Sequence, residues 1–234
     1  MTADFDIRPL GATGYLAPEG FAGELAAELG EGPAHGERLF VVPGPPQPAA
    51  WVQNLWPELV EIRFGSIGSA AKALRSLGRN WWPHPLAHFR RATLIQEKLP
   101  HVSAKPLAFP AAAPTAPLGA WALVEPDRLI ASPAAASPFP DGEARFAEDR
   151  EGPPSRAYLK LWEALALARR WPRPGERCLD LGAAPGGWTW SLATLGAEVV
   201  SVDKAPLDPK VAALPNVTHR LESAFGLDPA TEPA

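Results

Sequence analysis

The sequence predicts an α/β protein in two parts, a small α+β region at residues 1–132 and a Rossmann-like α/β segment at residues 155–234. In the second part, short apolar runs of strand length alternate with helical patterns, as in parallel α/β folds. A Gly-rich turn joins the first of these strands to its helix. In the first part, strands and helices are mixed without such regular alternation. Residues 133–154, rich in Pro, Ala, Asp and Glu, are predicted to be the linker.

The elements of the first part are predicted from side-chain periodicity and from the residues that end each run. Strands are predicted at 12–16, 39–42, 58–64, 120–124 and 128–132, and helices at 20–29 and 67–77. The last two strands flank the turn Glu125-Pro126-Asp127 and are expected to pair. The Pro-rich stretch 106–117 is predicted to be a loop within this part.

The second part begins with a helix that Ser155 is expected to cap and that starts near Arg156. Strands at 177–181, 198–202 and 217–221 follow, with a helix at 188–195 between the first two. Gly196 stands just after that helix, where a C-terminal cap is expected. Strand, helix and strand joined by short loops imply parallel strands and a right-handed crossover.

The turn after Leu181 has the composition of a ligand-binding loop. Gly182 lets the chain bend sharply without a side chain in the way of a ligand, and Gly186 and Gly187 are expected to keep the surface bare where the next helix begins. The first N–H groups of that helix suit a carboxylate or another electron-rich group. Asp203, at the end of the next strand, can accept hydrogen bonds from two ribose hydroxyls. The pattern therefore predicts a nucleoside-type ligand at the carboxyl ends of the strands.

Other interpretations of this turn fail at specific residues. The dinucleotide fingerprint requires G-x-G-x-x-G, whereas the glycines here are Gly182, Gly186 and Gly187, with Pro185 inside the turn. A P-loop requires Gly-Lys followed by Ser or Thr, which the sequence lacks. A tight strand-to-helix turn without a ligand remains as the bland alternative.

Three segments resemble the FtsJ-like family of RNA ribose 2′-O-methyltransferases: Leu-Asp-Leu-Gly-Ala-Ala-Pro-Gly-Gly-Trp at 179–188, Val-Ser-Val-Asp-Lys-Ala-Pro-Leu at 200–207, and Ser-Arg-Ala-Tyr-Leu-Lys-Leu-Trp-Glu at 155–163. The likeness is to members that methylate a cytidine ribose in large-subunit ribosomal RNA. It implies S-adenosyl-L-methionine (AdoMet) as the cofactor. The cofactor-binding residues that we expect are Asp180, Gly182, Ala184, Pro185, Gly186, Gly187, Trp188, Asp203 and Ser223. Ser223 falls near a position at which relatives carry an acidic contact to adenine.

The resemblance also implies a catalytic set of Lys, Asp, Lys and Glu, of which Lys160 matches the first lysine. A lysine there can steer the ribose or, with a lowered pKa, help deprotonate the 2′-hydroxyl. The bland alternative is a solvated helix lysine. No residue of this chain matches the later three, and a complete domain of this type has more strands than residues 155–234 can form. We therefore expect an incomplete sheet with an exposed apolar edge strand at 177–181, and a fragment of a longer enzyme; whether the fragment is active by itself stays open.

Charge is unevenly distributed, and the local excess is in the first part. The formal net charge is −4, yet residues 72–105 carry seven Lys or Arg against one Glu. Aromatic and His side chains lie among these cations, a combination that suits phosphates and stacked bases. Lys72, Arg75, Arg79, Arg90 and Arg91 are the expected RNA contacts, against the alternative of a solvated helix face. The 1–132 region also resembles, weakly, the THUMP-type RNA-binding region that precedes the methyltransferase domain in relatives.

Composition excludes several other classes. The single cysteine, Cys178, rules out a disulfide framework, and the histidines lack metal-ligand spacing, so no metal is expected. The first residues do not have the pattern of a signal peptide and no apolar run has membrane-spanning length, so we expect a cytoplasmic protein. Three functions stay open: a methyltransferase acting on RNA ribose, a non-catalytic RNA-binding protein with a vestigial methyltransferase fold, and a methyltransferase for another substrate.

Overall fold

The computed structural model describes residues 4–30, 34–227 and 230, and the chain divides into two compact units. The first unit comprises Met1–Lys105 and Pro114–Ala144, and the second comprises Pro106–Ala113 and Arg145–Ala234. Residues 106–113 thus belong to the second unit, not to a loop within the first. The stretch predicted as a linker, 133–154, is divided between the units at residue 144.

Two β-sheets form the frame of the first unit. The larger sheet has the strand order β1-β6-β9-β8-β7, and all its neighbours are antiparallel except β7 and β8. The smaller sheet has the order β3-β4-β2-β5 and is antiparallel throughout. The strands are β1 Phe5–Pro9, β2 Ala12–Leu16, β3 Ala34–His35, β4 Leu39–Pro43, β5 Asn54–Trp56, β6 Val60–Phe64, β7 Trp81–Pro83, β8 Gly119–Glu125 and β9 Arg128–Ser132.

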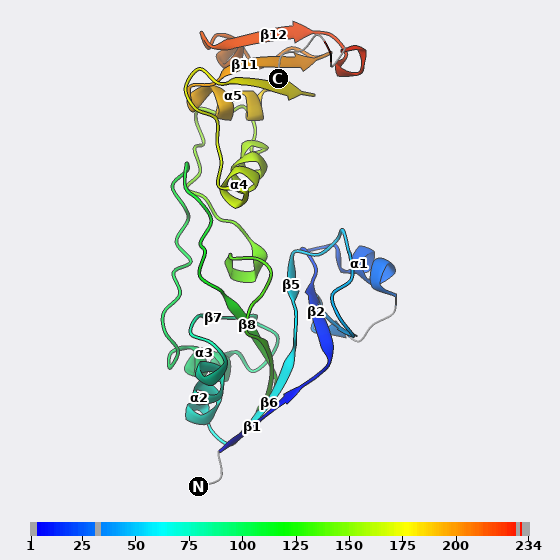
Figure 1. The fold of residues 1–234 in the computed structure, drawn as a ribbon, viewed down its shortest axis with the longest axis vertical. Helices are drawn as coiled ribbons and strands as arrows, with labels where there is room; N and C mark the ends of the chain where they lie inside the picture. The colour runs from blue at the N-terminus through cyan, green and yellow to red at the C-terminus, as the bar shows by residue number, and fades with distance from the viewer. Residues whose placement is uncertain (1–3, 31–33, 228–229, 231–234) are drawn as a thin grey trace. The chain divides into compact units, whose positions relative to one another are not determined.

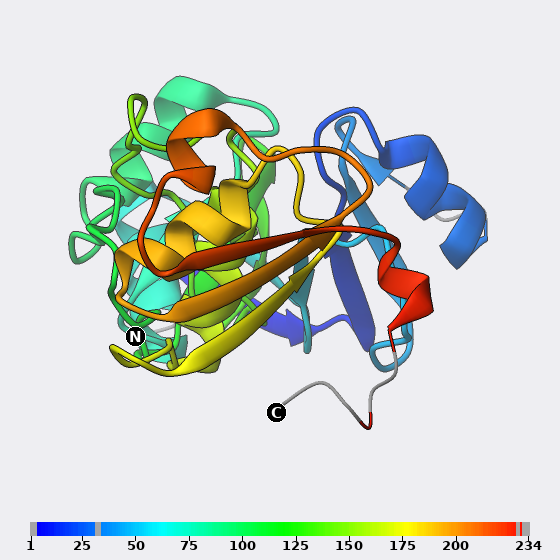
Figure 2. The ribbon, with the colours of Figure 1, turned by 90° about the horizontal axis from the view of Figure 1, so that it is seen from above.

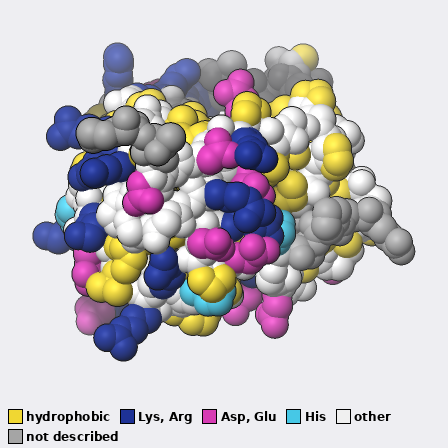
Figure 3. Space-filling view, turned by 90° about the horizontal axis from the view of Figure 1, so that it is seen from below, with side chains coloured by type: hydrophobic (Ala, Val, Ile, Leu, Met, Phe, Trp, Pro, Cys, Tyr) yellow, Lys and Arg dark blue, Asp and Glu magenta, His cyan; other side chains and the backbone are white. Residues whose placement is uncertain are grey.

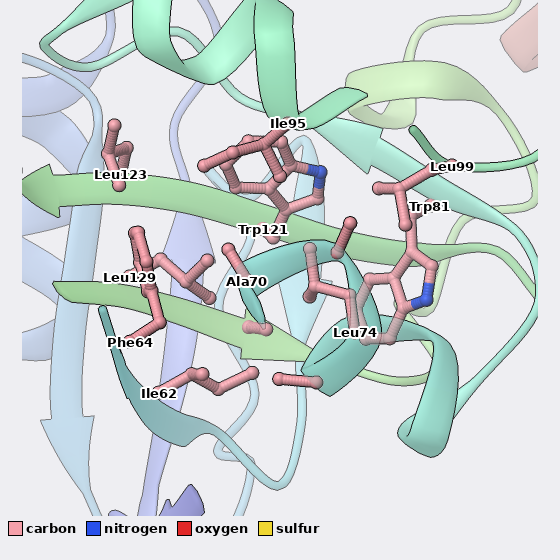
Figure 4. Packing of buried hydrophobic residues seen from close by; sticks show 13 residues of the cluster. Ile62, Phe64, Ala70, Leu74, Trp81, Ile95, Leu99, Trp121, Leu123 and Leu129 are labelled. Atoms are coloured by element: carbon pink, nitrogen blue, oxygen red, sulfur yellow. The ribbon is translucent and has the colours of Figure 1, made fainter. Parts of the chain in front are cut away.

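Helices α2 (Ile67–Leu77) and α3 (Phe89–Gln96) cover one face of the five-stranded sheet (Figure 1). Ser66 and Ser69 form a reciprocal capping box at the start of α2, which fixes where that helix begins. Figure 4 shows the core between these helices and the sheet, in which the indoles of Trp81 and Trp121 lie among Ile and Leu side chains. Both indoles are fully buried, so this cluster fixes α2 and α3 on the sheet.

The opposite face of the five-stranded sheet packs on the four-stranded sheet. Ala122 and Ile130 from the larger sheet meet Leu16, Leu39 and Trp56 from the smaller one. The far face of the smaller sheet is covered by α1 (Ala22–Leu29). The first unit therefore has four layers, α2/α3, sheet, sheet and α1.

The second unit contains a three-stranded parallel sheet of order β10-β11-β12, with helices packed on one face (Figure 2). Its elements are α4 Tyr158–Ala168, β10 Arg177–Leu181, α5 Gly187–Thr194, β11 Glu198–Asp203, α6 Pro209–Ala212 and β12 Val217–Leu221. The predicted strands and their parallel pairing are confirmed. Strand β10 stands at the edge of the sheet, and its Leu179 and Leu181 side chains are 41% and 52% exposed. The expected exposed apolar edge is present among the described residues.

Three predicted starts of elements are wrong, each by about two residues. Helix α1 begins at Ala22 and not at residue 20, with Phe21 as its N-cap. The first helix of the second unit begins at Tyr158, with Ala157 as its N-cap, because a tighter turn with i→i+3 hydrogen bonds occupies the preceding residues. Ser155 therefore does not cap the helix, although its hydroxyl accepts the Ala157 N–H at 3.4 Å. Strand β6 begins at Val60 and not at residue 58, since Glu58 has a positive φ of 52° that breaks the extended run.

No helix in the described ranges is long and apolar enough to cross a membrane. In the same ranges, no group of three or more His, Cys, Asp or Glu side chains is placed to hold a metal ion.

Candidate cofactor site

A cavity of about 250 Å³ opens where β10 leads into α5. It lies at the carboxyl end of β10, the position at which open α/β sheets bind their ligands. The residues that line it come from the turn, from the first residues of α5 and from the segment leading into α4. They are Ser155, Ala157, Lys160, Asp180, Leu181, Gly182, Ala183, Ala184, Pro185, Gly187 and Trp188.

The three glycines of the turn have different roles. Gly182 has a φ of +76°, and a Cβ built on it would meet nothing within 4 Å, so it faces open space at the cavity. A Cβ on Gly186 would lie 3.0 Å from Val211, and one on Gly187 would lie 2.8 Å from the Ser155 hydroxyl. Only Gly182 is therefore bare toward a ligand. Gly186 and Gly187 permit close packing of the turn, which corrects the reason that the sequence suggested for them.

Asp203, the last residue of β11, is bound to the turn. Its Oδ2 accepts the backbone N–H of Ala184 at 2.9 Å, and its Oδ1 accepts that of Ala205 at 2.9 Å. These backbone donors, Ala205 first and Ala184 second, hold the pKa of the carboxyl below its usual value of 3.8. The carboxylate thus stays ionised at neutral pH, and each oxygen has a second lone pair with which to accept a ribose hydroxyl.

Asp180 is more deeply buried than Asp203, and its side chain joins β10 to α5. Its Oδ2 accepts the hydroxyl of Thr189 at 2.6 Å, and both side chains are buried, with exposed fractions of 5% and 0%. Burial raises the pKa of Asp180, the hydrogen bonds from Thr189 lower it, and the charge of Asp203 raises it further. The backbone N–H of Thr189 also donates to Asp180, so the pair fixes the first turn of α5.

The wall opposite the turn is formed by the start of α4. Lys160 is exposed and lines the same cavity as Gly182 and Ala184. The indole of Trp188 donates to the carbonyl of Ala157 at 2.9 Å, which ties the start of α5 to this wall. A basic side chain is therefore presented to the same space as the Gly-rich turn.

The structure brings together seven of the residues that the sequence suggested for this site and leaves three at its margin. Lys160, Asp180, Gly182, Ala184, Pro185, Gly187 and Trp188 line the cavity. Gly186 packs beneath the turn, Asp203 contacts it through Ala184, and Ser223 lies two residues beyond β12, outside the lining. Ser155, Ala157, Leu181 and Ala183 also line the cavity, and sequence reasoning missed them. For Ser155 and Ala157 the signal was available, because both lie in the motif at 155–163.

The five basic residues predicted to contact RNA lie on α2, on α3 and just after α2. Lys72, Arg75, Arg79 and Arg90 are exposed. Arg91 is half-buried, with its guanidinium 5.7 Å from the centroid of the Phe64 ring. In Figure 3, Lys and Arg side chains gather toward one side of the face shown, whereas near its centre they alternate with Asp and Glu.

The second unit matches a known class of enzyme. Residues 153–223 match the family described as FtsJ-like methyltransferase, so the chain contains an FtsJ-like methyltransferase segment, as its motifs indicate.

The relatives are ribosomal RNA methyltransferases. The chain is 45% identical over 97 residues to the ribosomal RNA large subunit methyltransferase M of Halorhodospira halophila, a match that covers 40% of this chain and 28% of that protein. Proteins of the same name from Saccharophagus degradans (44% over 82 residues, 32% and 24% covered) and Xanthomonas campestris pv. campestris (40% over 107 residues, 43% and 30% covered) are also similar. The chain thus covers less than a third of each of these relatives.

Proposed function

We propose that the second unit binds AdoMet at the β10–α5 turn and serves methyl transfer to a ribose 2′-hydroxyl of RNA, with ribosomal RNA as the substrate class. The observation that carries the proposal is the cavity in which an open Gly182, the Asp203-anchored turn and Lys160 meet. The names of the relatives support a ribosomal RNA substrate. Such a substrate would place the protein in the cytoplasm.

The residues present fit this cofactor. Gly182 leaves space that a Cβ would occupy, and Asp203 offers an ionised acceptor for ribose hydroxyls beside it. The backbone N–H groups of Gly187 and Trp188, the residues of α5 that line the cavity, are available to donate to a carboxylate. Gly182, Ala184, Pro185, Gly187 and Asp203 would hold the group. When bound, AdoMet supplies the methyl group for in-line displacement by the 2′-oxygen, which releases S-adenosylhomocysteine and the hydroxyl proton.

Lys160 is the residue of this chain that we assign to the reacting ribose. Its ammonium group, on the opposite wall of the cavity, can donate hydrogen bonds to the ribose and stabilise negative charge that develops on the 2′-oxygen. In the first unit, Lys72, Arg75, Arg79 and Arg90 are proposed to contact RNA phosphates, in a domain of THUMP type. Arg91 is assigned to packing because it covers Phe64.

The test is the fate of the methyl group. The chain is incubated with ribosomal RNA and methyl-labelled AdoMet, and the RNA is digested to nucleosides for mass spectrometry. We expect label in a 2′-O-methyl nucleoside, lost in Lys160→Ala and retained in Lys210→Ala, an exposed lysine of α6. Label on a base, on protein or on a small molecule would contradict the assignment to ribose. RNA binding without any AdoMet binding would favour the non-catalytic alternative.

A further inference from the structure

The first unit contains a larger cavity, of about 660 Å³, that the methyltransferase site does not use. It is lined by β7, by α3, by the segment 99–104 that follows α3, and by Asp141. Its volume falls in the range typical of sites for small organic groups. Its lining is mainly apolar and aromatic, and includes Trp82, Phe89 and His101.

Two aromatic side chains of this cavity are left open to solvent. Phe89 is 62% exposed although it begins α3, and Trp82 is half-buried. The neighbouring Trp81 is fully buried in the core and shows that this segment can bury an indole completely. Exposed aromatic faces beside a cavity form a platform on which a planar ring can stack.

The charges of the cavity select the chemistry of its occupant. Within the described residues its lining includes the carboxylates Glu97 and Asp141 but no Lys or Arg. Asp141 is held in place, since its Oδ1 lies 3.1 Å from Nδ1 of the buried His84. Two carboxylates disfavour a phosphate inside the cavity. They favour a neutral ring with amino donors, such as the N4 amino group of cytosine or the N6 amino group of adenine.

Exposed cations adjoin three of the lining residues in the sequence. Arg90 follows Phe89, Lys98 follows Glu97, and Lys105 follows the lining residue Ala104; all three cations are exposed. Exposed cations so close in sequence to an apolar cavity suit a single strand, because its bases can enter the cavity while its phosphates contact Lys and Arg nearby. The amide of Gln96 is engaged by the Trp81 carbonyl and the Trp121 indole, so it serves the wall of the cavity.

We propose that this cavity binds one unpaired nucleobase of RNA, a base with an exocyclic amino group, stacked on Phe89 and Trp82. The inference rests on the proposed function only in that RNA is the ligand. It assigns to the first unit a base-binding site in addition to a phosphate-binding surface, and hence a preference for single-stranded over paired RNA.

The test measures binding of short fluorescein-labelled RNA to the full chain by anisotropy over a series of salt concentrations. We expect Phe89→Ala to weaken binding of oligo(C) or oligo(A) by about fivefold to a hundredfold, the range for loss of one stacked base. The slope of log affinity against log salt should stay unchanged, because Phe89 carries no charge. Arg90→Ala should instead reduce that slope by about one.

The matched control is Phe21→Ala. Phe21 is 40% exposed and stacks on Trp51 at 4.7 Å, but its surroundings carry Glu24 and Glu28, so its loss should leave RNA binding unchanged. Equal affinities of wild type and Phe89→Ala, equal binding of duplex and single strand, or absence of RNA binding would each overturn the base site. Oligo(U) bound as tightly as oligo(C) and oligo(A) would overturn the role of the amino group. None of these results bears on AdoMet binding by the second unit, which is measured separately.

Discussion

Replacement of Thr189 by Val removes one hydroxyl from a buried, charged hydrogen bond. The Thr189 hydroxyl donates to Asp180 Oδ2 at 2.6 Å, and neither side chain is more than 5% exposed. Hydrogen bonds to charged groups contribute about 1.5–3 kcal/mol. Burial of the methyl group that replaces the hydroxyl raises the free energy of unfolding by about 0.8 kcal/mol. We therefore expect a net loss of about 1–2 kcal/mol in the free energy of unfolding of the second unit.

The loss has a pH signature with a definite sign. The lost donor stabilised the ionised form of Asp180, so the penalty is fully present above the folded-state pKa of that carboxyl. Burial already raises this pKa above 3.8, and Thr189→Val should raise it further. The difference in stability between wild type and variant should therefore shrink as the pH falls through the pKa of Asp180.

Urea denaturation of wild type and variant at several pH values measures both quantities. Thr194→Val is the matched control, because Thr194 lies on the same helix but is exposed and donates only to the carbonyl of Ser191. Equal destabilisation by the two substitutions, or a Thr189→Val effect that does not change with pH, would refute the role given to the Asp180 hydrogen bond.

Three further outcomes are expected. Gly182→Ala should cost about 1–2 kcal/mol of stability, from its positive φ alone, yet weaken AdoMet binding at least about tenfold in calorimetric titration, because the new methyl group enters the cavity. An NMR titration should place the pKa of Asp203 below 3.8. The contribution of this carboxylate to stability is then present above its pKa in the unfolded chain and is lost as the pH falls through its lower pKa in the folded protein. A titration midpoint above 3.8 would contradict the role given to the backbone donors. Trp162→Phe removes the 2.7 Å indole hydrogen bond to Ser191 between α4 and α5 and should lower the free energy of unfolding by about 1–3 kcal/mol, whereas an unchanged urea midpoint would show that α4 is held in another way.

The second unit is the part of the fold that its sequence predicts best. Strands β10 and β12 have the predicted bounds: Gly175 and Gly182 flank β10, and Pro215 precedes β12. Several elements of the first unit were not predicted. β7 has three residues, too few for a periodic signal, and α3 begins after His88 in a left-handed conformation without a side-chain cap. β1 was missed although Phe5 and Ile7 alternate with Asp6 and Arg8, because the alternation covers only four residues before Pro9.

The sequence predicts those contacts of the candidate site that follow from the strand–turn–helix–strand pattern. It does not predict contacts between residues that are far apart in the sequence. The turn follows β10 and Asp203 ends β11, so the parallel pairing of these two strands brings them together. The contact of Gly187 with Ser155 joins residues 32 positions apart, and that of Gly186 with Val211 joins residues 25 apart. Nothing in the turn itself indicates such partners. For the same reason the stacking position of Arg91 on Phe64, which removes it from the RNA-facing residues, required the structure.

The most direct test of the AdoMet site is a calorimetric titration of the full chain with AdoMet, compared with Asp203→Ala and with Asp208→Ala as the control. Asp208 caps the short helix α6 in the same unit and does not line the cavity. We expect saturable binding at one site in wild type and in Asp208→Ala, and a loss of about tenfold or more in Asp203→Ala, because a charged acceptor for the ribose is removed. Absence of AdoMet binding in wild type, or equal affinity in Asp203→Ala, would contradict the assignment of the β10–α5 turn as the cofactor site.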